Sequence, residues 1–187
     1  MMRDKKDMNN INQIKLIVLD CDGVLTDGKI IYDNDQTESK NFSAHDGLGA
    51  KILSFSDIQI AVVTGRESLC LKKRCEDLRI TLLYQSIQNK RQTIEKILED
   101  LQLEWENVAY MGDDWNDWPA MKKAGLKTAP ASANFAIKER VDWVSPRDGG
   151  DGAVRDLIDY ILKKQGKYES CIEKFLIHLD DNISFVN

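Results

Sequence analysis

The sequence lacks several features that would assign it to a common class of protein. It has no excess of basic residues, since 26 Lys and Arg stand against 31 Asp and Glu, which gives a net charge of −5. Nucleic-acid-binding domains carry a basic surface, so this balance argues against nucleic acid as a partner. No apolar run approaches the roughly 20 residues that a membrane-spanning helix needs, so no membrane partner is expected.

Targeting and disulfide patterns are also missing. The first 13 residues are polar and contain no apolar core of the kind found in secretory signals. Four cysteines occur, and they form neither a CxxC pair nor a zinc-like cluster: Cys21, Cys70, Cys75 and Cys171. We therefore expect reduced thiols and a cytoplasmic location.

What the chain does contain is an alternation of apolar runs and helical patterns, which predicts an α/β fold. The run over 14–19 is almost wholly apolar, as in a strand buried on both faces. Further strands are predicted over 58–63, 80–84, 108–111, 126–128 and 142–144. Helices are predicted over 47–56, 67–78, 90–103, 119–124, 135–140 and 152–164. The order indicates a doubly wound, mostly parallel sheet of Rossmann-like type.

The pattern also divides the chain into segments. Residues 1–13 are interpreted as a flexible N-terminal lead-in, and residues 14–165 as one domain. Within it, two short runs flank the turn-rich stretch 33–36, so a projecting β-hairpin is predicted over about 28–42. Residues 166–187 form a C-terminal extension with apolar residues at helical spacing and no assigned role.

Polar residues follow three of the predicted strands. Asp20 and Asp22 follow the first, residues 64–66 (Thr-Gly-Arg) follow the second, and residues 112–114 (Gly-Asp-Asp) with Asp117 follow a later one. The carboxyl ends of parallel strands meet at one edge of the sheet, where ligands bind in folds of this kind. We therefore expect these three segments to build one site.

The acidic residues at this edge predict a metal ion. On an extended chain Asp20 and Asp22 point the same way, and two carboxylates at one spot repel each other. Asp113 would add to the crowding, which a divalent cation relieves, and an all-oxygen ligand set suits Mg²⁺. The alternative is that Asp-x-Asp-Gly is only a turn, but the other two strand ends favour the metal site.

The remaining polar residues fit phosphate. Thr64 and Gly65 can hold a phosphoryl oxygen through a hydroxyl and a backbone N–H, and Arg66 can bind a phosphate or a carboxylate. Taken alone, this tripeptide fits a plain turn between a strand and a helix better, and that is the alternative. Lys90 begins a predicted helix, where backbone N–H groups already favour an anion, although a solvated surface lysine is the alternative. Asp117 precedes Trp118-Pro119 and fits a helix N-cap.

Together these segments resemble the four motifs of the haloacid dehalogenase superfamily, in the right order over residues 14–165. The resemblance implies that Asp20 is the nucleophile, forming an aspartyl-phosphate, and that Asp22 is the general acid and base. It implies that Mg²⁺ is held by Asp20, the backbone carbonyl of Asp22, and Asp113. Lys90 is then a catalytic cation and a phosphoryl ligand. The resemblance also implies that Asp114 and Asp117 support the site without being ligands of the metal.

The spacing of the motifs leaves no room for a cap domain. The chain is similar to the capless members that act on 3-deoxy-D-manno-octulosonate 8-phosphate, which are tetramers. This resemblance implies a homotetramer and the release of free sugar acid and phosphate in lipopolysaccharide precursor synthesis. Cys21 stands where these relatives usually have Val or Ile, and we interpret it as a small buried hydrophobe.

The same resemblance implies a set of residues around the substrate, a small sugar-acid phosphate. Basic side chains in this set suit a molecule that carries both a carboxylate and a phosphate. The implied substrate-binding residues are Asp22, Ser43, Ala44, His45, Asp46, Gly47, Lys51, Thr64, Gly65, Arg66, Arg74 and Lys90.

Two alternatives remain open at this point. Relatives that act on nine-carbon, sialic-acid-type 9-phosphates share the motifs, so the sequence separates the two substrates poorly. A non-catalytic regulatory homologue would retain the same fold without turnover.

Overall fold

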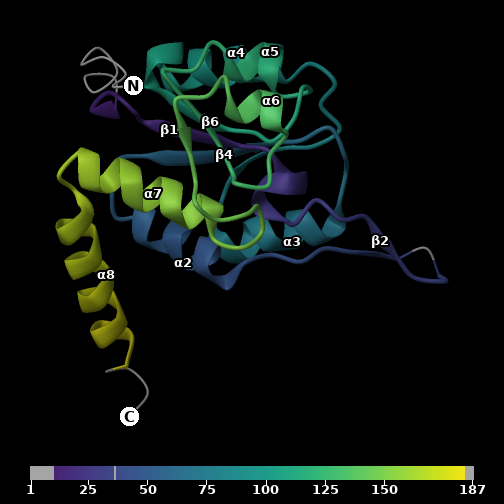
Figure 1. Cartoon of the computed structure of the whole chain (residues 1–187). Helices are drawn as coiled ribbons and strands as arrows, with labels where there is room; N and C mark the ends of the chain where they lie inside the picture. The colour runs from purple at the N-terminus through teal and green to yellow at the C-terminus, as the bar shows by residue number, and fades with distance from the viewer. Residues whose placement is uncertain (1–10, 36, 184–187) are drawn as a thin grey trace.

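A six-stranded parallel sheet forms the centre of the protein (Figure 1). The structure is a computed structural model that describes residues 11–35 and 37–183. The strands of this sheet are, in chain order, β1 (Leu16–Leu19), β4 (Gln59–Val63), β5 (Leu82–Tyr84), β6 (Val108–Met111), β7 (Leu126–Ala129) and β8 (Trp143–Val144). All neighbouring pairs are parallel, in the order β5-β4-β1-β6-β7-β8. The predicted α/β class and doubly wound sheet are confirmed.

Helices cover both faces of this sheet. They are α2 (Ala44–Leu53), α3 (Leu69–Leu78), α4 (Lys90–Leu101), α5 (Trp118–Met121), α6 (Phe135–Lys138), α7 (Ala153–Lys164) and α8 (Tyr168–Ile183), with a short 3₁₀ turn η2 (Trp105–Asn107). Figure 1 shows α4, α5 and α6 on one face and α2, α3 and α7 on the other. Within residues 11–35 and 37–183, no helix is long and apolar enough to cross a membrane.

Strand β1 explains why two hydrophobic cores exist. Its side chains alternate between the faces of the sheet, as the geometry of a strand requires. Leu16 and Val18 pack into the core under α4 and α5, whereas Ile17 and Leu19 pack into the core under α2 and α7. All four are fully buried. An unbroken apolar run therefore placed β1 correctly as a central strand, with a core on either side.

The order of the strands reverses beside β1. From β1 the chain builds β4 and β5 on one side, and then returns to build β6, β7 and β8 on the other. The carboxyl ends of β1, β4 and β6 consequently lie next to one another at the point of reversal. Ligands of doubly wound sheets bind at this point.

The predicted hairpin is present and projects from the domain (Figure 1). It consists of β2 (Ile31–Tyr32) and β3 (Glu38–Ser39), an antiparallel pair joined by only two residue pairings. Three apolar side chains on it are exposed: Ile30, Ile31 and Tyr32. Two short strands are marginal in water when they stand alone.

Several predicted boundaries are wrong by a few residues. The helix predicted over 47–56 begins at Ala44 and ends at Leu53. Gly47 and Gly49 lie inside it, and glycine has a low helix propensity, which obscured the first turn. The helices predicted over 119–124 and 135–140 are four-residue turns, α5 and α6.

Both ends of the described chain pack on the domain. Residues 1–10 of the predicted lead-in lie outside the described residues, but Ile11 is buried in the core. The side-chain amide of Gln165 donates to the carbonyls of Ile11 and Ile14, at 2.8 and 3.0 Å. The extension left unassigned by its sequence forms α8, which packs against α2 and α7. Its Phe175 ring lies 6.2 Å from the ring of Phe55.

Asp57, in the turn between α2 and β4, joins two distant segments. Its carboxylate accepts hydrogen bonds from Lys15 beside β1 and from Lys167 before α8. These bonds, that of Lys15 first, lower the pKa of Asp57 below its ordinary value. A carboxylate with a lowered pKa stabilises the fold above its unfolded pKa of about 4. This stabilisation is lost as the pH falls through the folded pKa.

We expect Asp57→Asn to lower the free energy of unfolding at pH 7 by about 1 kcal/mol, a modest value because the carboxylate is 52% exposed. The loss should shrink as the pH is lowered below about 4. Urea unfolding of both proteins across this range measures it. The control is Asp77→Asn, which breaks an exposed pair with Lys73 inside α3. Equal losses in the two variants would contradict a special role for Asp57.

Candidate active site

The three polar strand ends meet in one open cleft of about 260 Å³. It lies at the carboxyl edge of the sheet, where β1, β4 and β6 end. The residues that line it are Asp20, Asp22, Gly28, Thr64, Gly65, Arg66, Asp113, Asp114 and Asn116. The structure therefore brings together the segments that the sequence singled out.

Lys90 is a buried cation at the base of this cleft. It is the first residue of α4, is 5% exposed, and its Nζ lies 2.8 Å from Asp20 Oδ1 and 2.7 Å from Asp117 Oδ1. Burial alone would lower the pKa of Lys90, but Asp20 and Asp117 together raise it, so the ammonium stays charged. The alternative of a solvated surface lysine is wrong, because the helix starts directly beneath the strand ends.

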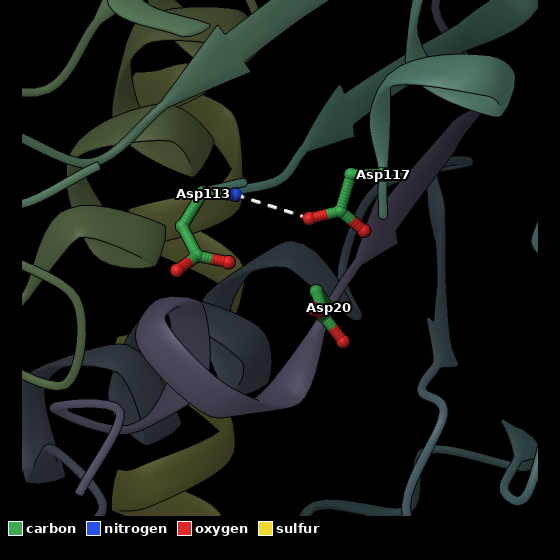
Figure 2. Close-up of side chains that lie close together, drawn as sticks. All are labelled: Asp20, Asp113 and Asp117. Atoms are coloured by element: carbon green, nitrogen blue, oxygen red, sulfur yellow. Dashed lines mark hydrogen bonds between the residues drawn. The ribbon is translucent and has the colours of Figure 1, made fainter. Parts of the chain in front are cut away.

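Asp117 holds its neighbours instead of capping a helix through its side chain. It occupies the N-cap position of α5 but makes no side-chain cap bond. Its Oδ1 accepts from Lys90 and from the hydroxyl of Tyr110, at 2.7 and 2.9 Å, and its Oδ2 accepts from the Asp113 N–H at 3.1 Å (Figure 2). A buried ammonium and hydroxyl compete better for this carboxylate than the N–H groups of a one-turn helix. The predicted N-cap position of Asp117 is therefore confirmed, although its carboxylate makes no capping bond.

Three carboxylates crowd together here. Single oxygens of Asp20, Asp113 and Asp117 all lie within 4.8 Å of one another (Figure 2). Burial first, and then Asp117, raise the pKa of Asp20 to about 6. Burial, Asp117 and Asp20 raise the pKa of Asp113 to about 7. Crowding of this kind opposes ionisation and calls for positive charge nearby.

One divalent cation would neutralise the charge of this cluster. Three carboxylates less the single ammonium of Lys90 leave two negative charges. The donors are all oxygen, which suits a hard cation such as Mg²⁺. Asp117 already accepts three hydrogen bonds, so Asp20 and Asp113 are the side chains that fit the metal best. The donor set therefore agrees with a magnesium site.

A tight turn presses the first motif against Asp113. After β1 the chain coils through η1 (Cys21–Leu25), and Gly23 within it has φ +87°. A Cβ on Gly23 would stand 2.2 Å from Asp113 Oδ2, and one on Gly149 would stand 1.8 Å from the Gly23 carbonyl oxygen. Only glycine allows this approach. Cys21 in the same turn is buried, as its interpretation as a small hydrophobe requires.

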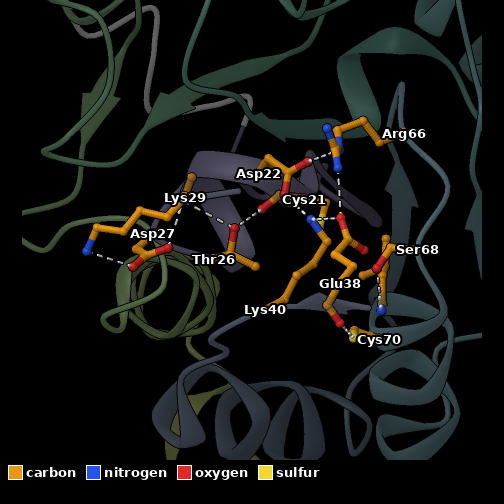
Figure 3. A network of polar contacts seen from close by, with 12 residues as sticks. Cys21, Asp22, Thr26, Asp27, Lys29, Glu38, Lys40, Arg66, Ser68 and Cys70 are labelled. Carbon is orange, nitrogen blue, oxygen red and sulfur yellow. Dashed lines mark hydrogen bonds and ion pairs between the residues drawn. The ribbon is translucent and has the colours of Figure 1, made fainter. Parts of the chain in front are cut away.

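The coil also separates the two motif carboxylates. Asp20 and Asp22 line the same cleft, but they have different partners. Asp20 bonds to Lys90. Asp22 Oδ1 bonds to Lys40, and Asp22 Oδ2 lies 3.5 Å from Arg66 Nε (Figure 3). The extended geometry assumed for this pair ends at Asp20, which is itself extended, because the chain coils from Cys21 onward. Each carboxylate consequently has its own cation.

Lys40 and Glu38, on the stem of the hairpin, are residues that the sequence reasoning missed. The Lys40 side chain is 2% exposed, and its Nζ is 3.5 Å from Glu38 Oε1. Glu38 Oε1 also accepts from Arg66 Nη2 at 2.8 Å (Figure 3). The hydroxyl of Tyr32 accepts from the same nitrogen at 3.0 Å. Glu38 lies in β3 and Lys40 directly follows it, and residues two positions apart on an extended chain point the same way, so their charge pattern could have indicated them.

The second motif, residues 64–66, also lines the cleft. Thr64 is buried, and its backbone N–H donates to the Tyr84 carbonyl at 3.0 Å. There is free space beside the Cα of Gly65, because the nearest atom to an added Cβ would be the Ile87 carbonyl oxygen at 3.7 Å. Arg66 keeps 41% of its side chain exposed. Phosphoryl and substrate contacts by these residues stay a prediction.

Asp114 sits at the rim of the cleft. Its Oδ1 accepts from the N–H of Trp115 at 2.7 Å and from Asn134 Nδ2 at 3.4 Å. These contacts fix the loop that follows Asp113. Its predicted role in support of the site stays a prediction.

The other predicted substrate residues lie away from this cleft. Ser43, Asp46, Gly47 and Arg74 line a separate hollow of about 10 Å³, and Arg74 Nη2 donates to the Ser43 carbonyl at 2.9 Å. Asp46 Oδ1 accepts from the N–H of Arg155 in α7 at 2.8 Å.

Ala44 and His45 are exposed on α2, and Lys51 faces a groove beside α8. None of these three lines the cleft of Asp20. Roles of residues 43–47, Lys51 and Arg74 as substrate ligands therefore stay predictions.

The close approach of Gly23 to Asp113 yields a test. We expect Gly23→Ala to weaken Mg²⁺ binding by about tenfold or more, because the added Cβ displaces a carboxylate that fits the metal. Isothermal titration with MgCl₂ measures this affinity. The variant should also lose more stability in urea than the cost of a positive φ alone, about 1 kcal/mol.

Gly166→Ala is the matched control, since Gly166 has φ +67° and nothing within 4 Å of an added Cβ. It should show only the backbone cost. Equal stability losses and unchanged Mg²⁺ affinity in the two variants would refute the close-approach argument.

Known proteins resemble both the sequence and the fold. The sequence profile of the haloacid dehalogenase-like hydrolases matches residues 82–158. The 3-deoxy-D-manno-octulosonate 8-phosphate phosphatase KdsC of Escherichia coli strain B/BL21 is 44% identical over 162 residues, which are 87% of this chain and 86% of that protein.

Solved structures agree with this match. That of 3-deoxy-D-manno-octulosonate 8-phosphate phosphatase from Moraxella catarrhalis, in complex with magnesium, phosphate and KDO, has a TM-score of 0.87 at 33% identity and covers 92% of this chain and 99% of its own. The cobalt-bound Haemophilus influenzae phosphatase has a TM-score of 0.81 at 40% identity, with 85% and 93% covered. The chain belongs to the haloacid dehalogenase-like hydrolases and, within them, to the family of the 3-deoxy-D-manno-octulosonate 8-phosphate phosphatases.

Proposed function

We propose that this protein is a Mg²⁺-dependent phosphatase that converts 3-deoxy-D-manno-octulosonate 8-phosphate into the free sugar acid and phosphate, in lipopolysaccharide precursor synthesis. The observation that carries the proposal is the buried cluster in which Lys90 holds Asp20 beside Asp113 at an open cleft. The family supports the substrate, since the Escherichia coli relative bears this name and the Moraxella catarrhalis structure holds magnesium, phosphate and KDO.

The contacts of Asp20 indicate which of its atoms attacks. Its Oδ1 accepts hydrogen bonds from the Cys21 N–H at 2.7 Å and from Lys90 at 2.8 Å. Oδ2 is therefore the oxygen left to attack phosphorus. In this step the bond from phosphorus to the sugar oxygen breaks, the leaving oxygen takes a proton from Asp22, and an aspartyl-phosphate forms.

Asp22 then reverses its role. Its carboxylate takes a proton from a water molecule as the oxygen of that water attacks phosphorus, which releases phosphate and restores Asp20. The Asp22 side chain is 20% exposed, so it reaches the solvent-filled cleft. A residue that gives and takes a proton needs this access, whereas the nucleophile can be buried.

The residues that would hold Mg²⁺ are Asp20, Asp113 and the backbone carbonyl of Asp22. When bound, the ion supplies positive charge that offsets the charge on the phosphoryl oxygens. Lys90 adds a fixed ammonium beside Asp20. It also keeps the nucleophile oriented, because it is buried and bound by two carboxylates.

The substrate carries two anionic groups, and basic side chains are available for both. Arg66 lines the cleft and keeps 41% of its side chain exposed, so it is suited to a substrate carboxylate or phosphate. Lys51, Arg74 and residues 43–47 lie on other parts of the surface of the same chain. A pocket completed between subunits would bring such residues to a neighbour's cleft.

A homotetramer assembled through the hairpins is therefore part of the proposal. Ile30, Ile31 and Tyr32 expose apolar surface on a hairpin that is too short to be stable alone. A cytoplasmic location is proposed as well, and it rests on four free cysteines.

Neither alternative function is favoured. The relatives are named for the eight-carbon substrate and not for a nine-carbon 9-phosphate. A purely regulatory role would not need Asp20, Lys90 and Asp113 to be assembled in a cleft.

We expect Asp20→Asn to lose at least about 1,000-fold in turnover, because an amide cannot act as the nucleophile. The assay is phosphate release from 3-deoxy-D-manno-octulosonate 8-phosphate with Mg²⁺ and, separately, with EDTA. In the wild type the eight-carbon substrate should show a higher kcat/KM than a nine-carbon 9-phosphate, and EDTA should abolish turnover.

Asp77→Asn on the surface of α3 is the control and should keep full activity. Circular dichroism establishes that both variants are folded. Undiminished activity of folded Asp20→Asn would sink the mechanism.

Light scattering tests the assembly. The wild type should have four times the 21.3 kDa mass of one chain. Ile31→Asp should shift this mass downward, because it places a charge in the proposed apolar contact. Leu69→Asp alters a lone, 79% exposed apolar residue on α3 and should leave the mass unchanged. A monomeric wild type would refute the hairpin assembly.

A further inference from the structure

We infer that Lys40 is a positioning residue that orients the Asp22 carboxylate for proton transfer to the leaving oxygen. The inference rests on the proposed phosphatase function, to which it adds a role for the hairpin stem, residues 38–40. Lys40 belongs to none of the polar strand ends, so it is the hairpin that delivers it to the cleft.

Burial shows that Lys40 acts on Asp22 and not on the substrate. Its Nζ donates to Asp22 Oδ1, and its side chain is only 2% exposed. Arg66, which contacts the same carboxylate, is 41% exposed. A cation with so little accessible surface cannot bind a ligand that enters from solvent, whereas Arg66 can do so.

The charges around Asp22 balance without the metal cluster. Asp22 and Glu38 face Lys40 and Arg66, two negative charges against two positive ones. The cluster of Asp20, Asp113 and Asp117 has its own ammonium, that of Lys90. The stem cation therefore serves the proton-transferring carboxylate specifically.

The contacts also distinguish the two oxygens of Asp22. Lys40 bonds directly to Oδ1, whereas Oδ2 has Arg66 Nε at 3.5 Å, a looser ion pair. Glu38 holds both cations in place, since its Oε1 lies 2.8 Å from Arg66 Nη2 and 3.5 Å from Lys40 Nζ. Asp22 is thereby fixed through one oxygen, and Oδ2 is left as the atom that exchanges a proton.

A positioning role and a purely structural role predict different results with two substrates. The sugar phosphate has an alkoxide leaving group that needs a proton, whereas p-nitrophenolate leaves without one. Loss of a structural contact would impair both reactions alike. Loss of a group that orients the acid would impair mainly the first.

The experiment measures Lys40→Met and Lys40→Arg with Mg²⁺ on both substrates. For Lys40→Met, kcat/KM on 3-deoxy-D-manno-octulosonate 8-phosphate should fall by about 100-fold, the size of one general-acid contribution, with kcat carrying the loss and KM little changed. On p-nitrophenyl phosphate, kcat/KM should stay within about threefold of the wild type. Lys40→Arg keeps the charge and should recover most of the lost activity.

Two comparisons sharpen the test. Lys29→Met removes a 74% exposed cation that pairs with Asp27 at the base of the hairpin, and it should leave both reactions unchanged. In an Asp22→Asn background, Lys40→Met should cost nothing further in kcat/KM on either substrate, because the group that it positions is gone. Lys40→Gln, whose shorter neutral side chain removes the ammonium from Asp22, replaces Lys40→Met if thermal melts show that the latter is unfolded.

Equal losses on both substrates, or a full additional loss in the Asp22→Asn background, would overturn the inference. Wild-type activity in folded Lys40→Met would overturn it as well. A wild-type protein that shows no Mg²⁺-dependent hydrolysis of either substrate would overturn the proposed phosphatase function instead, so the two failures are distinguishable.

Discussion

The buried ammonium of Lys90 is the interaction on which the site depends. It lies between Asp20 and Asp117, and Asp117 in turn fixes the backbone of Asp113. Desolvating an ion costs several kcal/mol, and such a cost is recovered only where the partners are close and well bonded. Without this cation, three carboxylates would meet with no positive charge among the side chains of the cluster. Lys90, the first residue of α4, thus holds in place the residues that follow β1 and β6.

A second constraint is the separation of the two motif carboxylates. Asp20 and Asp22 are two positions apart, yet the coil at Gly23 gives each its own cation, Lys90 or Lys40. The proposed reaction needs a nucleophile that stays ionised and a neighbour that gives and takes a proton. One carboxylate that is buried beside an ammonium and another that reaches the cleft meet these two needs. The turn conformation of a single glycine therefore underlies the division of chemical roles.

The sequence was informative wherever a feature is local. The apolar run of β1 placed that strand correctly, and polar strand ends at a parallel sheet edge predicted the cleft. Long-range pairing could not be read in the same way. Lys40 meets Asp22 across 18 positions, so the sequence reasoning missed it. Lys90 meets Asp117 across 27, so its residue pattern alone left a surface lysine open as the alternative. Propensity also misled where glycine lies inside α2, because packing of the helix outweighs its cost.

The hairpin connects the chemistry of the cleft with the proposed assembly. Its stem carries Glu38 and Lys40, and its exposed Tyr32 bonds to Arg66, so a movement of the hairpin displaces the partners of Asp22. Two residue pairings join β2 to β3, and a single bridge between Thr26 and Phe42 closes the hairpin at its base. Contacts between subunits at the apolar side chains of the hairpin would make it more rigid. In that arrangement, the contacts between subunits that hold the hairpins in place would also orient Asp22, the general acid of each active site.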